Sequence, residues 1–322
     1  MGARARESGL ALSALALLLA VPMAFHSPAF EDFIIRLSAM GLFATSLNLL
    51  IGGAGMISFG HGMFYGLGAY AFALLMQRTT FSLPLSLLVT LTLAATAALA
   101  VGAICIRLKT IYFAFVTLAI QMLFYSVILS WQSLTGGDQG LRGGIPRRVI
   151  AGFDLNQQLN LYVFCSILLV AGLFAMRHIG ASPFGATLRM IRDNEPRAEF
   201  LGITIWQAKL GVFVLAALFA TLGGVLASLF VSGAYPELAD WPISGQAIFA
   251  VMLGGIESFL GPLLGTVVLL ALNDVFTRVT EYHGLVQGVV ILLFALGLRR
   301  GILDFLRAGR KSRRKRKAAA SP

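Results

Sequence analysis

Apolar stretches of about 20 residues recur along this chain from Leu10 to Leu298, and each is long enough to cross the bilayer's hydrocarbon core as a helix. The stretches are continuously apolar, whereas the strands of a membrane β-barrel alternate apolar and polar residues. Hydrophobic residues make up 58% of the chain and charged residues 12%, about half of what soluble domains carry. The sequence therefore predicts an all-α, polytopic integral membrane protein.

Breaks at glycine, proline and charged clusters divide the apolar sequence into ten candidate spans. The eighth and ninth are about 14 residues each, so they are either two half-helices, one re-entrant pair or two crossings. We therefore expect eight to ten transmembrane helices in one membrane domain over residues 1–298, with an uncleaved first helix. The candidate spans are 9–26, 30–51, 57–76, 83–106, 111–132, 159–177, 206–231, 244–257, 260–273 and 284–298.

The distribution of lysine and arginine predicts the orientation of these helices. With the amino terminus inside and ten crossings, 19 basic residues fall inside and 6 outside, which places both termini in the cytoplasm. Ten of the 25 basic residues lie between Arg299 and Lys317, so the tail, residues 299–322, carries much of this argument. We expect the tail to bind anionic lipid. No nucleic-acid partner is expected, since no aromatic residues interleave the basic ones.

Two glycine-rich segments interrupt the apolar pattern. The first, Gly52–Tyr70, and the second, Leu253–Thr266, share small residues at the same spacings, which is typical of close helix packing and of the internal repeats of transporters. Plain packing in a helix bundle remains the alternative. The matched positions are Gly55, Ser58 and Phe59 with Gly255, Ser258 and Phe259, and Gly62 and Gly66 with Gly261 and Gly265.

Polar residues within the apolar helices are candidates for lining a translocation path. His61 lies in the first glycine-rich segment, where we expect a neutral ring hydrogen-bonded to backbone that the glycines leave free, rather than a proton relay. Thr117, Gln121 and Ser126 lie on the fifth span, and helix–helix hydrogen bonding is the alternative for each. The path candidates are Gly55, Ser58, His61, Thr117, Gln121, Gly255 and Ser258.

The longest cytoplasmic connection contains a polar, helix-forming segment over residues 182–203. Ser182 is suited to cap a helix that starts at Pro183, and a break is expected at Asn194–Pro196 before a second short turn that ends at Gly202. Two short helices of this kind, lying along the inner face of the membrane, would give a soluble protein a surface for docking. A solvated interfacial connection is the alternative.

No catalytic or metal-binding pattern stands out in the sequence. The two cysteines, Cys105 and Cys165, lie in apolar stretches and are expected to be small core residues. No grouping of His, Asp and Ser at helical spacing indicates an enzyme, and no metal site is predicted. An ion-coupled secondary transporter would need acidic residues at membrane depth, and Glu257 is the single candidate.

Several stretches together resemble the M-type permease of high-affinity branched-chain amino-acid ABC importers. The resemblance covers most of the chain, and the order and spacing of the stretches make it specific. The stretches are Gly52–Tyr70, Arg107–Tyr125, Trp131–Leu141, Ser182–Gly202 and Val251–Gly265.

This resemblance implies a non-catalytic permease subunit of the bacterial inner membrane. It implies three kinds of partner: a homologous second permease, two cytoplasmic ATPase subunits and an extracytoplasmic solute-binding protein. The chain itself contains no G-x-x-x-x-G-K-[ST] segment, so ATP would be bound by the partners and no cofactor is expected here. The resemblance also implies that the cytoplasmic segment contacts the ATPase, and the positions carried over are Arg189, Arg192, Glu195, Ala198 and Gly202.

The substrate implied by the resemblance is a branched-chain or other hydrophobic amino acid. The loop residues Asp138 and Gln139 depart from the family pattern, where an acidic or amide pair is common. Related permeases carry urea or short amides, so an importer of these is the alternative, ahead of an ion-coupled secondary transporter.

Overall fold

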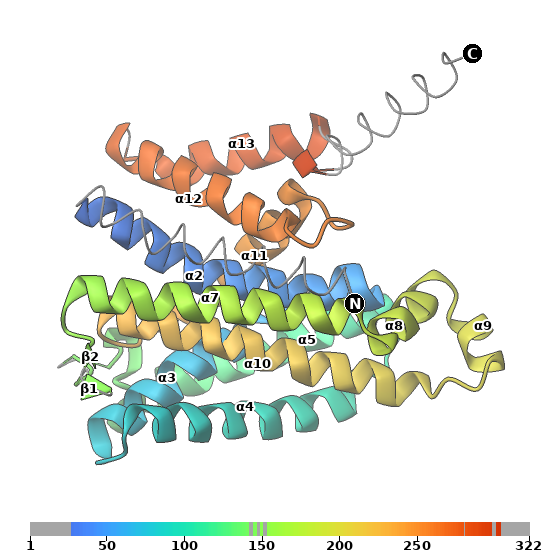
Figure 1. Ribbon diagram of the computed structural model, residues 1–322, viewed down its shortest axis with the longest axis horizontal. Helices are drawn as coiled ribbons and strands as arrows, with labels where there is room; N and C mark the ends of the chain where they lie inside the picture. Colours follow the sequence, from blue (N-terminus) through green and yellow to red (C-terminus); the bar gives the residue numbers. More distant parts are fainter. Residues whose placement is uncertain are drawn as a thin grey trace.

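The computed structural model describes residues 27–141, 144–146, 149–150, 153–279, 281–297 and 301–303. These residues form a bundle in which most long helices run along one direction (Figure 1). The short antiparallel strands β1 (Val149–Ile150) and β2 (Phe153–Asp154) lie at one end of the bundle, with Val149 opposite Asp154. Helices α8 and α9 lie at the other end. We call these the β1–β2 end and the α8–α9 end.

The helices have the following bounds. They are α2 (Pro28–Asn48), the π-helix η1 (Leu49–Ala54), α3 (Gly62–Arg78), α4 (Leu83–Cys105), α5 (Thr110–Ser130), α6 (Gln132–Thr135), the 3₁₀ turn η2 (Gly137–Gln139), α7 (Gln158–Ala181), α8 (Pro183–Asp193), α9 (Glu195–Phe200), α10 (Ile205–Val231), the 3₁₀ turn η3 (Pro236–Leu238), α11 (Trp241–Gly254), α12 (Gly261–Val279) and α13 (His283–Gly297).

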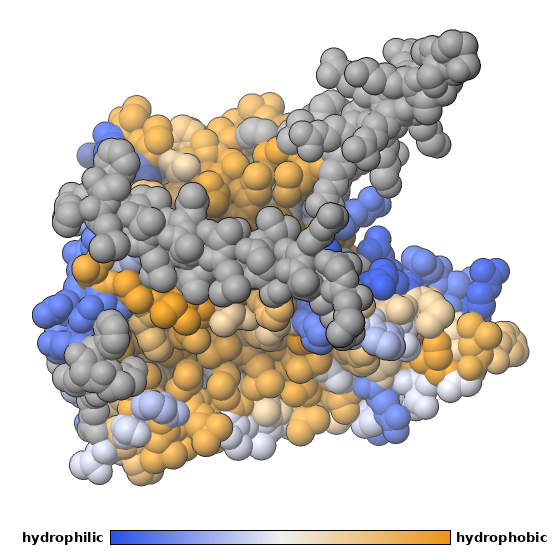
Figure 2. Space-filling model, in the orientation of Figure 1, coloured by the Kyte–Doolittle hydropathy of each residue, from blue (hydrophilic) through white to orange (hydrophobic). Residues whose placement is uncertain are grey.

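Six of these helices are long and apolar enough to cross a membrane: α2 with η1, α4, α5, α7, α10 and α12. Helix α11 is apolar but has only 14 residues. Hydrophobic residues cover the middle of the bundle and hydrophilic residues gather at its two ends (Figure 2). The prediction of an all-α polytopic membrane protein is therefore confirmed, while the number of crossings stays a prediction. The expected first span, 9–26, and nearly all of the basic tail lie outside the described residues.

Several expected spans have other ends than the helices observed; α11, for example, covers Trp241–Gly254 where 244–257 was expected. The span expected at 57–76 begins only at Gly62, because residues 55–61 form a non-helical connection that starts at Gly55, with φ +70°. Helix α12 continues to Val279, whereas the expected span ended at 273, before Asp274 and Arg278. Helix α12 is thus a 19-residue span rather than a half-helix.

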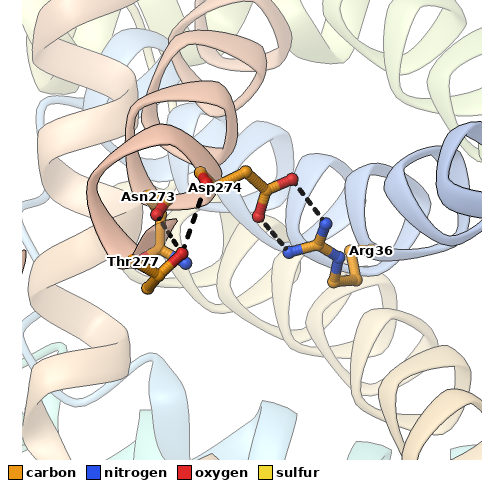
Figure 3. A network of polar contacts seen from close by, with 4 residues as sticks. All are labelled: Arg36, Asn273, Asp274 and Thr277. Carbon is orange, nitrogen blue, oxygen red and sulfur yellow. Dashed lines mark hydrogen bonds and ion pairs between the residues drawn. The ribbon is translucent and has the colours of Figure 1, made fainter. Parts of the chain in front are cut away.

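The charge of Asp274 is tolerated within α12 because α2 carries its partner. Both guanidinium Nη atoms of Arg36 donate to the carboxylate of Asp274, at 2.7 Å each (Figure 3). The Thr277 hydroxyl caps backbone carbonyls of the same turn, those of Asn273 and Asp274. A bidentate ion pair of this kind offsets the free-energy cost of placing a charge in an apolar helix.

Helix α2 forms the centre of the bundle. In its most apolar stretch 94% of the residues are buried, against 22% in α4. Helix α10 packs against α2 and α3 through glycines. A side chain at Gly223 would lie 2.6 Å from the backbone carbonyl oxygen of Ala39 on α2, and one at Gly224 would collide with the backbone carbonyl of Tyr65 on α3. A side chain at Gly68 of α3 would likewise collide with the backbone carbonyl of Thr221 on α10. Such small-residue contacts let helix backbones approach where water gives no hydrophobic driving force. The core therefore depends on glycine as much as on large side chains.

Candidate functional site

Two breaks between helices have the same local construction, as the repeated glycines and serines predict. The first break, residues 55–61, lies between η1 and α3, and the second break, residues 255–260, lies between α11 and α12. Each begins with a glycine at positive φ, +70° at Gly55 and +113° at Gly255, a conformation that side chains disfavour. Ser58 and Ser258, at matching positions, are both fully buried.

The second break lies against the π-helix η1, which leads into the first break. A side chain at Gly52 of η1 would come within 2.8 Å of the carbonyl oxygen of Ile256 in the second break and 2.7 Å of Asn48 Oδ1. In the first break, the backbone of Gly60 lies against the backbone carbonyl of Thr117 on α5. Short π-helical segments inside longer helices occur often at functional sites. The two glycine-rich segments thus touch where Gly52 of η1 packs against Ile256 of the second break.

His61 lies at the start of α3 and is fully buried. Its Nε2 is 2.9 Å from the hydroxyl oxygen of Ser46 on α2, and its ring stacks on Phe43 with centroids 5.5 Å apart. We expected a hydrogen bond to free backbone; the partner is instead a side chain of the neighbouring helix. His61 therefore joins α3 to α2 in the described structure.

Of the three polar residues expected on the fifth span, Gln121 joins helices in the described structure and Thr117 and Ser126 do not. Gln121 is buried, and its side-chain oxygen accepts a hydrogen bond of 2.8 Å from the Ser244 hydroxyl on α11. Ser244 in turn accepts from the backbone N–H of Gly62 on α3. The Thr117 hydroxyl donates to Ala114 within its own helix. An open hollow on the outer surface of α5 is lined by Ser126, Val127, Ser130 and Trp131.

The polar segment at the opposite end folds as its sequence predicts. The Ser182 hydroxyl accepts a hydrogen bond from the backbone N–H of Gly185, and Pro183 is the first residue of α8. Asn194 ends α8 and caps α9 through its side chain, which accepts from Arg197 N–H at 2.9 Å. Gly202 follows α9 with φ +81°. Two short helices thus follow one another with a sharp break at Asn194.

Within this segment some residues face the bundle and others face away from it. Ala198 is 1% exposed, so it packs α9 against the protein. Glu195 pairs with Lys209 of α10 at 2.8 Å. Phe200 and Leu201 are 92% and 67% exposed at the end of α9. These two apolar residues were not among the sequence candidates, although two large apolar side chains at the end of a polar helix are a signal that could have identified them.

Two arginines, Arg189 and Arg192, anchor the segment, and Arg177 of α7 lies beside it. Arg192 on α8 donates to the carbonyl of Gly52 in η1 at 2.6 Å, and its side chain lies 3.2 Å from where a side chain at Gly55 would begin. Arg177, at the end of α7, lies 5.6 Å over the ring of Phe259 in the second break. Arg189 instead donates to Gly180 at the end of α7, at 2.7 Å. The α8–α9 segment is therefore in direct contact with η1 and the first break through Arg192, whereas the second break is contacted by Arg177 of α7.

Comparison with known proteins places this chain in a family. Residues 29–295 match the family described as the permease component of branched-chain amino acid transport systems. The chain is 26% identical over 284 residues to the high-affinity branched-chain amino acid permease protein LivM of Escherichia coli K12, covering 81% of this chain and 67% of that protein. It is 26% identical to LivH of Salmonella typhimurium, covering 83% of this chain and 91% of that protein.

The chain also matches a sugar permease over a shorter stretch. Over 36% of this chain and 38% of that protein, the chain is 29% identical to the ribose import permease protein RbsC of Bacillus subtilis. No solved structure matches the chain. The family match spans most of the chain and includes both breaks and the α8–α9 segment. The chain therefore belongs to the family of permease components of branched-chain amino acid transport systems.

Proposed function

We propose that this chain is the transmembrane permease subunit of an ABC importer that carries branched-chain or other hydrophobic amino acids across the bacterial inner membrane. Family membership supports the permease role, and the names of LivM and LivH support the substrate class and a pair of homologous permeases. The complex would further contain two cytoplasmic ATPase subunits and an extracytoplasmic solute-binding protein. The α8–α9 end and both termini would lie in the cytoplasm, with the basic tail against anionic lipid.

The contact of the α8–α9 segment with η1 and the first break carries this proposal. The exposed Phe200 and Leu201 offer an apolar surface for an ATPase subunit, while Arg192 faces inward and binds Gly52. Movement of a docked ATPase would thus act directly on the irregular backbone of η1. Because irregular backbone changes conformation more readily than a regular helix, the breaks are where the path would switch between its outward-open and inward-open states.

The function is tested by reconstituting the chain with its partner permease, ATPase and binding protein in liposomes. With the binding protein outside the liposomes, we expect ATP enclosed in the lumen to drive uptake of radiolabelled leucine. Excess urea or acetamide should leave that uptake unchanged. Uptake driven by an ion gradient without ATP would contradict the ABC assignment. Uptake of urea in place of leucine would contradict the amino-acid assignment.

The docking surface has its own test. Replacing Phe200 and Leu201 with alanine should lower co-purification of the ATPase at least tenfold, since exposed apolar residues that fit a partner's pocket contribute about 2 kcal/mol or more to such interfaces. The matched control is Phe81→Ala, because Phe81 is a partly exposed aromatic residue in the connection before α4 at the other end of the bundle. Equal loss in both variants would remove the docking assignment.

A further inference from the structure

A group of tyrosines and carboxylates gathers at the β1–β2 end, beside the turn η3. Helix α3 packs against the chain just after η3, and this contact shows which face of α3 is turned toward the group. A side chain at Gly66 would collide with Ala239, just after η3. Tyr70 lies four residues further along α3 and so on the same face, one turn nearer the β1–β2 end. Tyr70 therefore faces the connection that contains η3.

Helix α5 faces the same connection from another side. The side-chain amide of Gln121 donates to the backbone carbonyls of Ala239 and Asp240, at 3.0 and 2.9 Å. Tyr125 lies four residues further on, on the face of Gln121 and again one turn nearer the β1–β2 end. Two helices thus bring a phenol each to the same short stretch of chain.

That stretch contributes two carboxylates, Glu237 in η3 and Asp240 before α11. Tyr70 interacts electrostatically with Glu237, and Tyr125 interacts with both Glu237 and Asp240. One carboxylate oxygen of Asp240 accepts from the Trp241 N–H. No lysine or arginine of the described residues pairs with either carboxylate. The group therefore has a net negative charge that nothing described neutralises.

The hydroxyl of Tyr70 points to a ligand. Tyr70 is 3% exposed, and its hydroxyl is buried without a hydrogen-bond partner in the described structure. A buried polar atom left unpaired costs about 1–3 kcal/mol, which a bound ligand would recover. Two carboxylates and phenol oxygens are acceptors, and phenol rings attract cations through their faces, so the chemistry fits a cation with N–H donors.

We propose that Tyr70, Tyr125, Glu237 and Asp240 bind the ammonium group of the amino acid entering the permease. This inference rests on the proposed function, because it takes the substrate to be an amino acid. A primary ammonium has three N–H donors and a single positive charge. The two carboxylates and the Tyr70 hydroxyl would accept its three hydrogen bonds, and the carboxylates would balance its charge. The depth of Tyr70 favours a small ligand over a lysine on the surface of a partner protein, which would have to insert into the group.

Binding is measured on the complete transport complex in lipid nanodiscs, without the solute-binding protein, by calorimetric titration. The probes are leucine, 3-methylbutylamine, which has leucine's side chain and amine without the carboxylate, and 4-methylpentanoate, which lacks the amine. We expect the first two to bind and the third not to bind. Binding of 4-methylpentanoate as tight as that of the amine would overturn the proposal.

Variants then test the individual residues. Glu237→Gln combined with Asp240→Asn should weaken amine binding at least tenfold, while Glu281→Gln, an exposed residue in the turn before α13, should leave it unchanged. Tyr70→Phe should weaken amine binding severalfold and raise the melting temperature of the free complex, because it removes a buried unpaired hydroxyl. A residue with only a structural role would not lower affinity while raising stability.

The outcomes separate this inference from the proposed function. If the wild-type complex binds 3-methylbutylamine but does not import leucine, the site stands and the amino-acid function fails. If leucine is imported but the carboxylate variants bind the amine as tightly as wild type, the site is wrong. If those variants lose capture of the solute-binding protein while amine binding is unchanged, the group is a docking surface for that protein and the proposal is overturned.

Discussion

At the scale of single residues, glycines and one ion pair determine how the helices of this bundle approach one another. Gly224 allows α10 to touch the backbone of α3 at Tyr65, and Arg36 on α2 neutralises Asp274 on α12. Both kinds of contact depend on individual side chains or on their absence. Their energies are therefore accessible to single substitutions.

Gly224→Val is expected to destabilise the protein by about 2 kcal/mol or more, because the added carbons overlap the Tyr65 carbonyl and the helices must separate. The matched control is Gly245→Ala in α11, where a side chain would meet nothing within 4 Å. Thermal unfolding in detergent, followed by tryptophan fluorescence, measures both. Equal melting temperatures for the two variants would contradict close packing at Gly224.

Arg36→Gln and Asp274→Asn should each destabilise the protein by about 2–3 kcal/mol, since each leaves the opposite charge unpaired between apolar helices. The double variant should be more stable than either single variant, because it leaves no charge behind. Unfolding of all four proteins in denaturant completes the double-mutant cycle. A coupling energy near zero would show that the pair contributes nothing.

The residue scale is also where prediction from sequence reached its limits. Ser58 and Ser258 were matched by spacing alone, and both are buried at equivalent points of the two breaks. The hydrogen bond between His61 and Ser46 could not be foreseen, since it joins residues whose distance depends on the non-helical path between them. Asp274 made α12 look short, because its partner Arg36 lies 238 positions away.

At the scale of elements, the α8–α9 segment and the π-helix η1 act as a connected pair. Caps at Ser182 and Asn194 are local signals, so the sequence predicted both short helices. The contact of Arg192 with Gly52 is not local, and the sequence analysis placed Arg192 only as an ATPase contact. That role stays a prediction, although the described side chain faces the bundle.

Arg192→Ala should reduce leucine uptake by the reconstituted complex about tenfold or more while the ATPase still co-purifies, because the docking surface remains and its link to η1 is lost. Arg189→Ala is the matched control, since Arg189 binds Gly180 of α7 and no residue of the breaks. The ratio of ATP hydrolysed to leucine imported is the decisive measurement. An unchanged ratio in Arg192→Ala would exclude a role in transmission.

At the scale of the whole molecule, apolar helices form a bundle whose two ends differ. One end carries α8 and α9, and the other carries β1 and β2 (Figure 1). Hydropathy predicted this architecture because each span is a local property of the chain. The contact of the second break with η1 depends on the packing of α2 against α11 and α12, which no local pattern contains.

The orientation of the bundle is testable with cysteines placed at each end. After Cys105 and Cys165 are replaced with alanine, Arg197→Cys and Ala319→Cys should react with an impermeant maleimide only from the cytoplasmic side. Asp138→Cys should react only from the opposite side, because the positive-inside distribution places basic residues in the cytoplasm. Labelling of Arg197→Cys and Asp138→Cys from one side would contradict the proposed topology.

The bidentate ion pair between Arg36 and Asp274 has a consequence for the insertion of the protein into the membrane. During synthesis α2 emerges more than 200 residues before α12, so Arg36 must first enter the bilayer without its carboxylate. An isolated charge there is unfavourable by about 3 kcal/mol, which the long apolar remainder of α2 can offset. Helix α12 contains charged residues and is less apolar, so its insertion would depend on an α2 already in place. Membrane insertion would then follow a fixed order, in which α12 inserts only after α2 is in the bilayer.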